Sequence, residues 1–155
     1  MPALKIAYGE ARKRDLPQLV ALLGVLFKQE AEFTPAPAKQ RRALALLLRR
    51  IYVARRGARV LGMVSVQRVI STAEGGAAGL LEDLVVRPGS RGAGVGAALL
   101  AFAIERSRAE GLLRLTLLTD GGNRRARALY RRAGFVASPM RPMRLAIPLA
   151  GRKAE

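Results

Sequence analysis

The chain has 155 residues, of which half are hydrophobic and a quarter charged, a balance typical of a folded globular protein. At this length we expect one domain, residues 1–155, that buries enough surface to fold without a disulfide or a metal. Arginines interrupt the apolar runs every few residues, which excludes a membrane span. The first residues lack the apolar core of a signal peptide, so a cytoplasmic location is expected.

The sequence contains no histidine and no cysteine. It therefore lacks the commonest metal ligands, the usual general base and the most reactive nucleophile. Ser-His-Asp hydrolysis, cysteine proteolysis and thiolate zinc sites are excluded, and no metal site is expected. An enzyme made from this chain has to move protons with carboxylates, tyrosines, lysines or water.

Basic residues outnumber acidic ones by 28 to 11, which gives a net charge of +17. Such a charge attracts nucleic acids, phosphorylated cofactors or acidic substrates, although genome composition alone would also explain it. The excess is uneven, because residues 33–73 contain basic side chains and no acidic one. We call this stretch the basic zone; its basic residues are Lys39, Arg41, Arg42, Arg49, Arg50, Arg55, Arg56, Arg59 and Arg68.

Hydrophobic periodicity predicts the first elements in chain order. A strand over 4–8 is followed by a helix that Asp15 caps and that extends to Leu26. After a connection broken by prolines, residues 41–50 predict a second helix. Residues 51–54, 60–70 and 79–86 then alternate as three strands joined by glycine-bearing turns, which indicates an antiparallel meander.

Beyond the meander the pattern becomes helical. A Pro/Gly loop over 87–94 leads to a helix over 95–110, and a buried strand over 112–119 follows. A last helix over 123–132 precedes two short strands, 135–136 and 143–149. The expected fold is α/β (α+β), with one mixed, mostly antiparallel sheet of six to seven strands flanked by about four helices.

The sharpest motif is Arg91-Gly92-Ala93-Gly94-Val95-Gly96, which lies between a strand and a helix. Glycines allow the backbone to approach a ligand closely, and the free N–H groups at a helix N-terminus attract anions. The motif therefore predicts an anion site whose natural ligand is a pyrophosphate.

The same glycines also fit a dinucleotide fingerprint, with Gly92, Gly94 and Ala97 at its three positions and Asp120 placed to bind a ribose. In that fold the strand runs almost directly into its first glycine, whereas here residues 87–91 intervene. A nucleotide or S-adenosylmethionine site nevertheless stays open as an alternative.

Two segments together resemble the GNAT superfamily of acetyl-CoA-dependent N-acetyltransferases. Residues 81–88 followed by 91–96 are similar to the family's fourth strand and its pyrophosphate loop. Residues 123–130 followed by 131–135 are similar to its N-x-x-A-x-x-[LF]-Y-x-x-x-GF segment. The resemblance covers nearly the whole chain and implies an acyl-CoA N-acyltransferase fold.

The resemblance also implies the site. The pantetheine arm of acetyl-CoA would pair with the backbone of a strand, the pyrophosphate would bind the glycine loop, and the last helix would contact the thioester. The implied cofactor-binding residues are Leu84, Val85, Val86, Arg91, Gly92, Ala93, Gly94, Val95, Gly96, Ala97, Asn123, Ala126 and Tyr130.

The implied catalytic residues are Tyr130 and Glu82. A phenol with a pKa of about 10 can protonate a departing thiolate, whose thiol has a pKa of about 8.5. An attacking amine has to lose a proton, and without histidine Glu82 is the carboxylate that we expect to assist. Strand alternation predicts that Asp83, the next residue, points to the opposite face.

The expected reaction is acetyl transfer from acetyl-CoA to a primary amine by direct attack in a ternary complex, without a covalent enzyme intermediate. The basic zone would lie beside the acceptor entrance, and few acids, among them Glu30 and Glu32, lie near it. We therefore expect an acidic amine or an acidic macromolecule as acceptor rather than a polyamine. A nucleic-acid partner is the other alternative, disfavoured by the scarcity of aromatics among the basic residues. A homodimer is compatible with the sequence.

Overall fold

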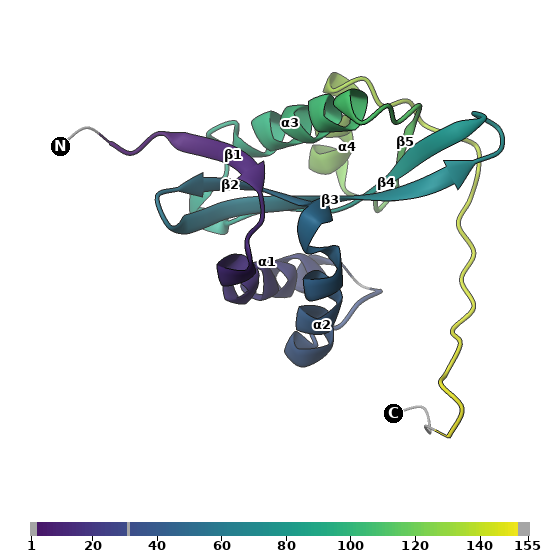
Figure 1. Cartoon of the computed structure of the whole chain (residues 1–155), viewed down its shortest axis with the longest axis horizontal. Helices are drawn as coiled ribbons and strands as arrows, with labels where there is room; N and C mark the ends of the chain where they lie inside the picture. The colour runs from purple at the N-terminus through teal and green to yellow at the C-terminus, as the bar shows by residue number, and fades with distance from the viewer. Residues whose placement is uncertain (1–2, 31, 152–155) are drawn as a thin grey trace.

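A computed structural model describes residues 3–30 and 32–151 of the chain. Its centre is one five-stranded sheet in the order β1-β2-β3-β4-β5 (Figure 1). The strands are β1 (Ile6–Glu10), β2 (Ile51–Arg56), β3 (Arg59–Ser71), β4 (Gly76–Val86) and β5 (Leu115–Leu117). The pairs from β1 to β4 are antiparallel, whereas β4 and β5 run parallel. The predicted mixed sheet and its central meander are confirmed.

Helices cover both faces of the sheet (Figure 1). They are α1 (Leu16–Gln29), α2 (Pro37–Leu47), α3 (Val95–Ala109) and α4 (Arg124–Arg132). The prediction placed the second helix at 41–50, but Pro37 starts α2 because a proline fits the first helical turn, where its missing N–H is not needed. In the part of the chain that the structure describes, no helix has the length and apolarity needed to cross a membrane.

Two apolar cores form on either side of the sheet because strand residues alternate between its faces. On one side α1 contributes Leu19 and Leu22, which are fully buried against strand residues such as Met63. On the other side Leu99 and Leu100 of α3 are equally buried. The sheet therefore holds α1 and α3 at fixed positions, and the site described below lies between their ends and β4.

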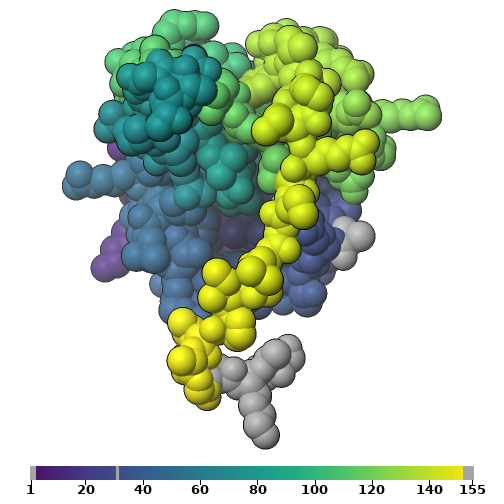
Figure 2. All heavy atoms as spheres, turned by 90° about the vertical axis from the view of Figure 1, so that its right-hand side faces the viewer, coloured from purple at the N-terminus to yellow at the C-terminus, as the bar shows by residue number. Residues whose placement is uncertain are grey.

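The two strands predicted after the last helix are absent from the described residues: neither 135–136 nor 143–149 pairs with another strand. The sheet consequently has five strands and not six to seven. Residues 136–151 are exposed and run along the outside of the molecule (Figures 1 and 2). Three prolines at 139, 142 and 148 remove backbone donors from this segment, which explains why alternation alone predicted strands wrongly.

Candidate active site

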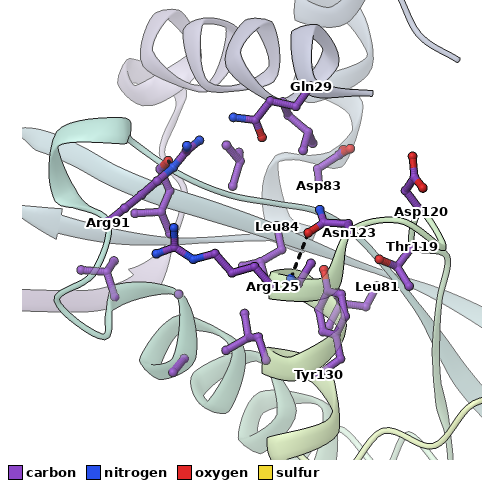
Figure 3. Close-up of a pocket in the computed structure, with 18 of the residues that line it drawn as sticks. Gln29, Leu81, Asp83, Leu84, Arg91, Thr119, Asp120, Asn123, Arg125 and Tyr130 are labelled. Carbon is purple, nitrogen blue, oxygen red and sulfur yellow. Dashed lines mark hydrogen bonds between the residues drawn. The ribbon is translucent and has the colours of Figure 1, made fainter. Parts of the chain in front are cut away.

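A cleft of about 710 Å³ opens between the C-terminal end of α1, the second half of β4 and the N-terminal ends of α3 and α4 (Figure 3). Every predicted site residue except Ala93 lines it. Those residues are Glu82, Leu84, Val85, Val86, Arg91, Gly92, Gly94, Val95, Gly96, Ala97, Asn123, Ala126 and Tyr130. The structure therefore brings together residues that are up to 48 positions apart in the sequence, from Glu82 to Tyr130.

The middle of β4 contains a β-bulge. Between the pairs Met63–Val85 and Ser65–Glu82, β3 has one residue and β4 has two. Asp83, inside the bulge, has a φ of 56°, in the left-handed region. A bulge breaks the alternation of side chains, and both Glu82 and Asp83 line the cleft. The prediction that Asp83 points away from the cleft is therefore wrong.

Strands β4 and β5 separate at the same place. Their parallel pairing covers only Gly79–Leu81 against Leu115–Leu117, and residues of both segments beyond this point line the cleft. This separation is why the strand predicted over 112–119 is only three residues long. The β4 backbone over 82–86 pairs with β3 on one side, and on its other side the described residues offer it no strand. An extended ligand could add there as a strand does.

The loop before α3 has the geometry of an anion site. Gly92 and Gly94 have φ values of 80° and 78°, which side-chain-bearing residues rarely adopt. A Cβ built on either glycine meets no atom within 4 Å, so the space before the loop is open. Within the described residues no side chain caps α3, and its first N–H groups at the positive end of the helix dipole are free for a ligand.

Helix α4 forms the opposite wall. The Oδ1 atom of Asn123 accepts a hydrogen bond from the N–H of Ala126 at 3.0 Å, which caps the helix and leaves the Asn123 amide NH2 for a ligand. Two turns later Tyr130 packs edge-on against Phe135, with 5.9 Å between ring centroids, and its hydroxyl points into the cleft (Figure 3). Burial, and to a smaller extent the charge of Glu30, raises the pKa of Tyr130. The phenol therefore stays protonated at neutral pH.

Charges are segregated along the cleft. Figure 3 shows Arg91 and Arg125 on one side, and Asp83 and Asp120 on the other. The carboxylates that line the cleft are Glu30, Glu82, Asp83 and Asp120. Burial, followed by repulsion from Asp120, raises the pKa of Glu30, so the end of α1 and the segment after β5 face each other across this acidic part.

Asp83 is the carboxylate best suited to take up a proton near neutral pH. Burial raises its pKa to about 6, and the charges of Glu82 and Glu30 add to the effect. Glu82 is held differently, because its Oε2 atom accepts a hydrogen bond from the side-chain amide of Gln67 at 3.2 Å. The bulge thus provides two carboxylates with separate environments.

Comparison with known protein families agrees with this architecture. The sequence model of the acetyltransferase (GNAT) family matches residues 17–135. The chain belongs to this family. The match begins at the start of α1 and ends just beyond α4, so it includes the whole cleft, and it confirms the resemblance drawn from the two motifs.

Individual relatives differ in how much they cover. An acetyltransferase of Trypanosoma brucei is 29% identical with a TM-score of 0.71, over 92% of this chain and 100% of that one. A predicted acetyltransferase of Clostridium acetobutylicum, solved with acetyl-CoA, is 16% identical with a TM-score of 0.76, over 91% and 96%. This second likeness shows the fold alone.

Mycothiol acetyltransferase of Beutenbergia cavernae is 46% identical over 59 residues. These residues are 38% of this chain but only 20% of that protein. The match therefore spans a fifth of the curated relative.

The basic zone takes no part in the lining of this GNAT cleft. Arg55 is buried in an ion pair with Asp15, whose Oδ2 lies 2.8 Å from its Nη2 atom. Arg50 donates to the carbonyl of Val66 and to the carboxylate of Glu110, each at 2.7 Å. The expectation that this zone lies beside the acceptor entrance and selects an acidic acceptor therefore gains no support from the lining of the cleft and stays a prediction.

Sequence reasoning missed several lining residues, notably Gln29 of α1, Arg125 of α4 and Asp83. One signal for Asp83 was present. Regular alternation would put it on the face of Leu81, which is buried against α3. A carboxylate placed in an apolar core is improbable enough to have indicated a bulge.

Proposed function

We propose that this chain transfers an acetyl group from acetyl-CoA to an amine by direct attack within one ternary complex. The main support for this proposal is that one cleft is lined by three features: a glycine loop with free helix N–H groups, a strand backbone without a neighbouring strand, and a protonated tyrosine. When bound, acetyl-CoA supplies a thioester whose carbonyl carbon an amine can attack. The antiparallel meander, with its single parallel pair, also argues against a dinucleotide-binding fold, which needs a mostly parallel sheet.

The residues present fit acetyl-CoA. The open space at Gly92 and Gly94 would admit the pyrophosphate to the N–H groups of 95–97, and Arg91 would add a positive charge. The backbone of 84–86 would pair with the amide groups of the pantetheine arm. The Asn123 amide faces the same space and would donate to it.

Proton transfer needs one donor and one acceptor. We propose that Tyr130 donates its proton to the departing thiolate and that Asp83 accepts a proton from the ammonium group of the acceptor. Glu82 would assist by keeping the pKa of Asp83 high. The prediction that Glu82 is itself the base is retained as the alternative, and the pH dependence of the variants separates the two.

A first prediction concerns the glycine loop. Acetyl-CoA should raise the melting temperature of the protein, since a ligand that binds only the folded state stabilises it. Replacing Gly94 with alanine should abolish most of this rise, because strain at its φ of 78° moves the N–H groups that bind the pyrophosphate.

Gly111 offers a matched control at the other end of α3. It has a φ of 75° and open space around it, so Gly111→Ala imposes similar strain away from the cleft. Both variants should melt a few degrees lower without ligand, and only Gly94→Ala should lose the acetyl-CoA effect. A larger rise with NAD or S-adenosylmethionine, or an equal loss in both variants, would reject the proposal.

The acceptor is the part of the proposal that the structure changes most. Asp83 and Asp120 lie on one side of the cleft, opposite Arg91 and Arg125 (Figure 3), and the charge of Glu30 acts on both Asp83 and Tyr130. A carboxylate on the acceptor would be repelled there. We therefore propose an amine that carries further positive charge, in place of the acidic acceptor that the sequence suggests.

Acetyl transfer to a panel of amines tests this second prediction. Free CoA can be detected with a thiol-reactive dye without background, because the chain contains no cysteine. A polycationic amine such as spermidine should give a kcat/KM about tenfold or more above that of an amine bearing a carboxylate, and the difference should shrink in high salt. Glu30→Gln should raise KM for the polycationic amine several-fold.

Glu105→Gln is the control for this substitution. Glu105 lies on the exposed side of α3, where it pairs with Arg108, and it does not line the cleft. Its loss should leave KM unchanged. Faster turnover of the acidic amine would support the acidic acceptor that the sequence suggests. If no amine released CoA, the proposed acetyl transfer would be rejected.

A further inference from the structure

A serine is buried in the middle of β3, where the neighbouring side chains are apolar. Ser65 exposes 1% of its surface and lies between the fully buried Val64 and Val66. A buried hydroxyl is costly unless it forms a hydrogen bond. The Oγ atom of Ser65 donates one to the backbone carbonyl of Glu82 at 3.2 Å. This serine therefore adds a bond from β3 to β4 that the two backbones do not provide.

The hydrogen bond lies at the β-bulge, because Ser65 pairs with Glu82 at the edge of it. The carbonyl of Glu82 belongs to the planar peptide group that precedes the Cα of Asp83, so its direction sets φ at Asp83. Among the described residues Asp83 is the one non-glycine residue with a φ in the left-handed region. Such a backbone persists only where its surroundings hold it. The Ser65 hydroxyl holds the peptide group on which this conformation depends.

Gln67 holds the side chain of the same glutamate. It lies two positions along β3 from Ser65, and strand alternation places both residues on one face. Its Nε2 atom donates a hydrogen bond to Oε2 of Glu82 at 3.2 Å, which keeps the carboxylate turned toward β3. Neither Ser65 nor Gln67 lines the cleft. Both ends of Glu82, its carbonyl and its carboxylate, are thus held from outside the cleft.

The carboxylate of Asp83 is not held in this way. Burial, followed by the charges of Glu82 and Glu30, raises its pKa to about 6, and no hydrogen bond from the described residues opposes these effects. Each wall of the cleft contributes groups around it: Glu82 from β4, Glu30 from α1, Asp120 after β5 and the protonated Tyr130 from α4, with Arg91 and Arg125 on the opposite side (Figure 3). Of the two carboxylates at the bulge, Asp83 is therefore the one that stays available to a ligand.

We propose that Ser65 and Gln67 are positioning residues for the two carboxylates at the bulge. Ser65 holds the backbone that brings Asp83 into the cleft, and Gln67 keeps Glu82 turned toward β3. Asp83 alone then meets the ammonium group of the acceptor. The inference rests on the proposed function, because it explains how residues outside the cleft assign the proton acceptor of that reaction to one carboxylate.

The titration of Asp83 tests the role of Ser65 without acetyl transfer. The chain has three aspartates, so carbon-13 labelling of the aspartate carboxyl groups gives three NMR signals, one of which Asp83→Asn removes. The midpoint of this signal should lie near pH 6 in wild type. Ser65→Ala should lower it by about one unit or more, because the bulge is no longer held and the carboxylate leaves its buried place. Asp15 verifies folding: although burial opposes the effect, hydrogen bonds from Arg55 keep its pKa below the ordinary value, and unfolding would remove that shift.

Ser107→Ala is the matched control. Ser107 exposes 3% of its surface, and its Oγ atom donates to the carbonyl of Ala103 at 2.8 Å, within α3 and away from the bulge. The variant removes a buried serine hydrogen bond of the same kind and should leave the Asp83 midpoint unchanged. An unchanged midpoint in Ser65→Ala, or an equal shift in Ser107→Ala, would overturn the role of Ser65.

Acetyl transfer tests the role of Gln67. Gln67→Leu removes the donor and frees the Glu82 side chain to reach the acceptor. In the Asp83→Asn background, which lacks the proposed base, Gln67→Leu should therefore raise kcat/KM about fivefold or more at pH 7.5, and a further Glu82→Gln substitution should abolish this gain. No gain, or a gain that survives Glu82→Gln, would overturn the role of Gln67. A wild-type protein without acetyl transfer would instead reject the proposed function, and with it the role of Gln67, while the titration would still decide the role of Ser65.

Discussion

Tyr130→Phe is expected to lower kcat for acetyl transfer by about 10²-fold or more while acetyl-CoA affinity changes little. The ring of Tyr130 packs against Phe135, and phenylalanine preserves that contact. Only the hydroxyl is lost, and with it the proton that we propose for the departing thiolate. Burial keeps this hydroxyl protonated well above neutral pH, so its loss should lower the rate over the whole range from pH 6 to 9.

Tyr52→Phe is the matched control. The Tyr52 hydroxyl lies 3.2 Å from a carboxylate oxygen of Glu110, outside the cleft. This variant should lose some stability and keep its kcat. If Tyr130→Phe retained full kcat, Tyr130 would be an aromatic of the core and water would have to protonate the thiolate.

Asp83→Asn is expected to lower kcat/KM about 10²-fold at pH 7.5 and to remove the rise in rate between pH 5 and 7. The wild-type rise should follow ionisation of Asp83, whose pKa is raised to about 6. Glu82→Gln should keep that rise but shift it to lower pH, because the negative charge of Glu82 helps to raise the pKa of Asp83. Initial rates against pH for the three proteins measure both effects.

Stability gives an independent readout of the same carboxyl group. Its pKa is higher in the folded protein than the usual 3.8, so the protonated form stabilises the fold below that value and the stabilisation is lost as pH rises through about 6. Asp83→Asn should therefore melt higher than wild type at pH 8 and gain less at pH 4. If Glu82→Gln, and not Asp83→Asn, abolished the pH-dependent rise in rate, Glu82 would be the base as the sequence suggested.

Most of the fold could be predicted because local patterns determine it. Alternation over 60–70 and 79–86 identified β3 and β4, and helical periodicity identified α1 and α3 within a few residues. The predictions failed where an element depends on pairing with another part of the molecule. Residues 143–149 alternate like a strand, but a strand also needs an edge with which to pair, and periodicity contains no information about edges.

The candidate site was predicted mainly through motif resemblance. The structure adds the lining residues that lie outside the two motifs or depend on the β-bulge. Glycines in the loop predicted an anion site, and the structure gives Gly92 and Gly94 the positive φ that glycine tolerates. The bulge at Asp83 was not visible in this way, since aspartate adopts regular strand geometry as well. The positions of Glu30 and Asp120 depend on how α1 and the segment after β5 approach β4, a long-range property. Net charge says little about the cleft itself, which four carboxylates line, because +17 is a property of the whole chain.

The left-handed backbone at Asp83 also limits which residues could replace it. Glycine, asparagine and aspartate adopt a φ of 56° at little cost, whereas longer and branched side chains adopt it only under strain. Of these three, aspartate alone carries an acid. Glutamate would bring the same charge at a greater backbone cost, so a variant in which Glu82 and Asp83 exchange places would not preserve the site. Single substitutions that keep the bulge unstrained thus remove the carboxylate, so this position can lose its acid without losing the fold.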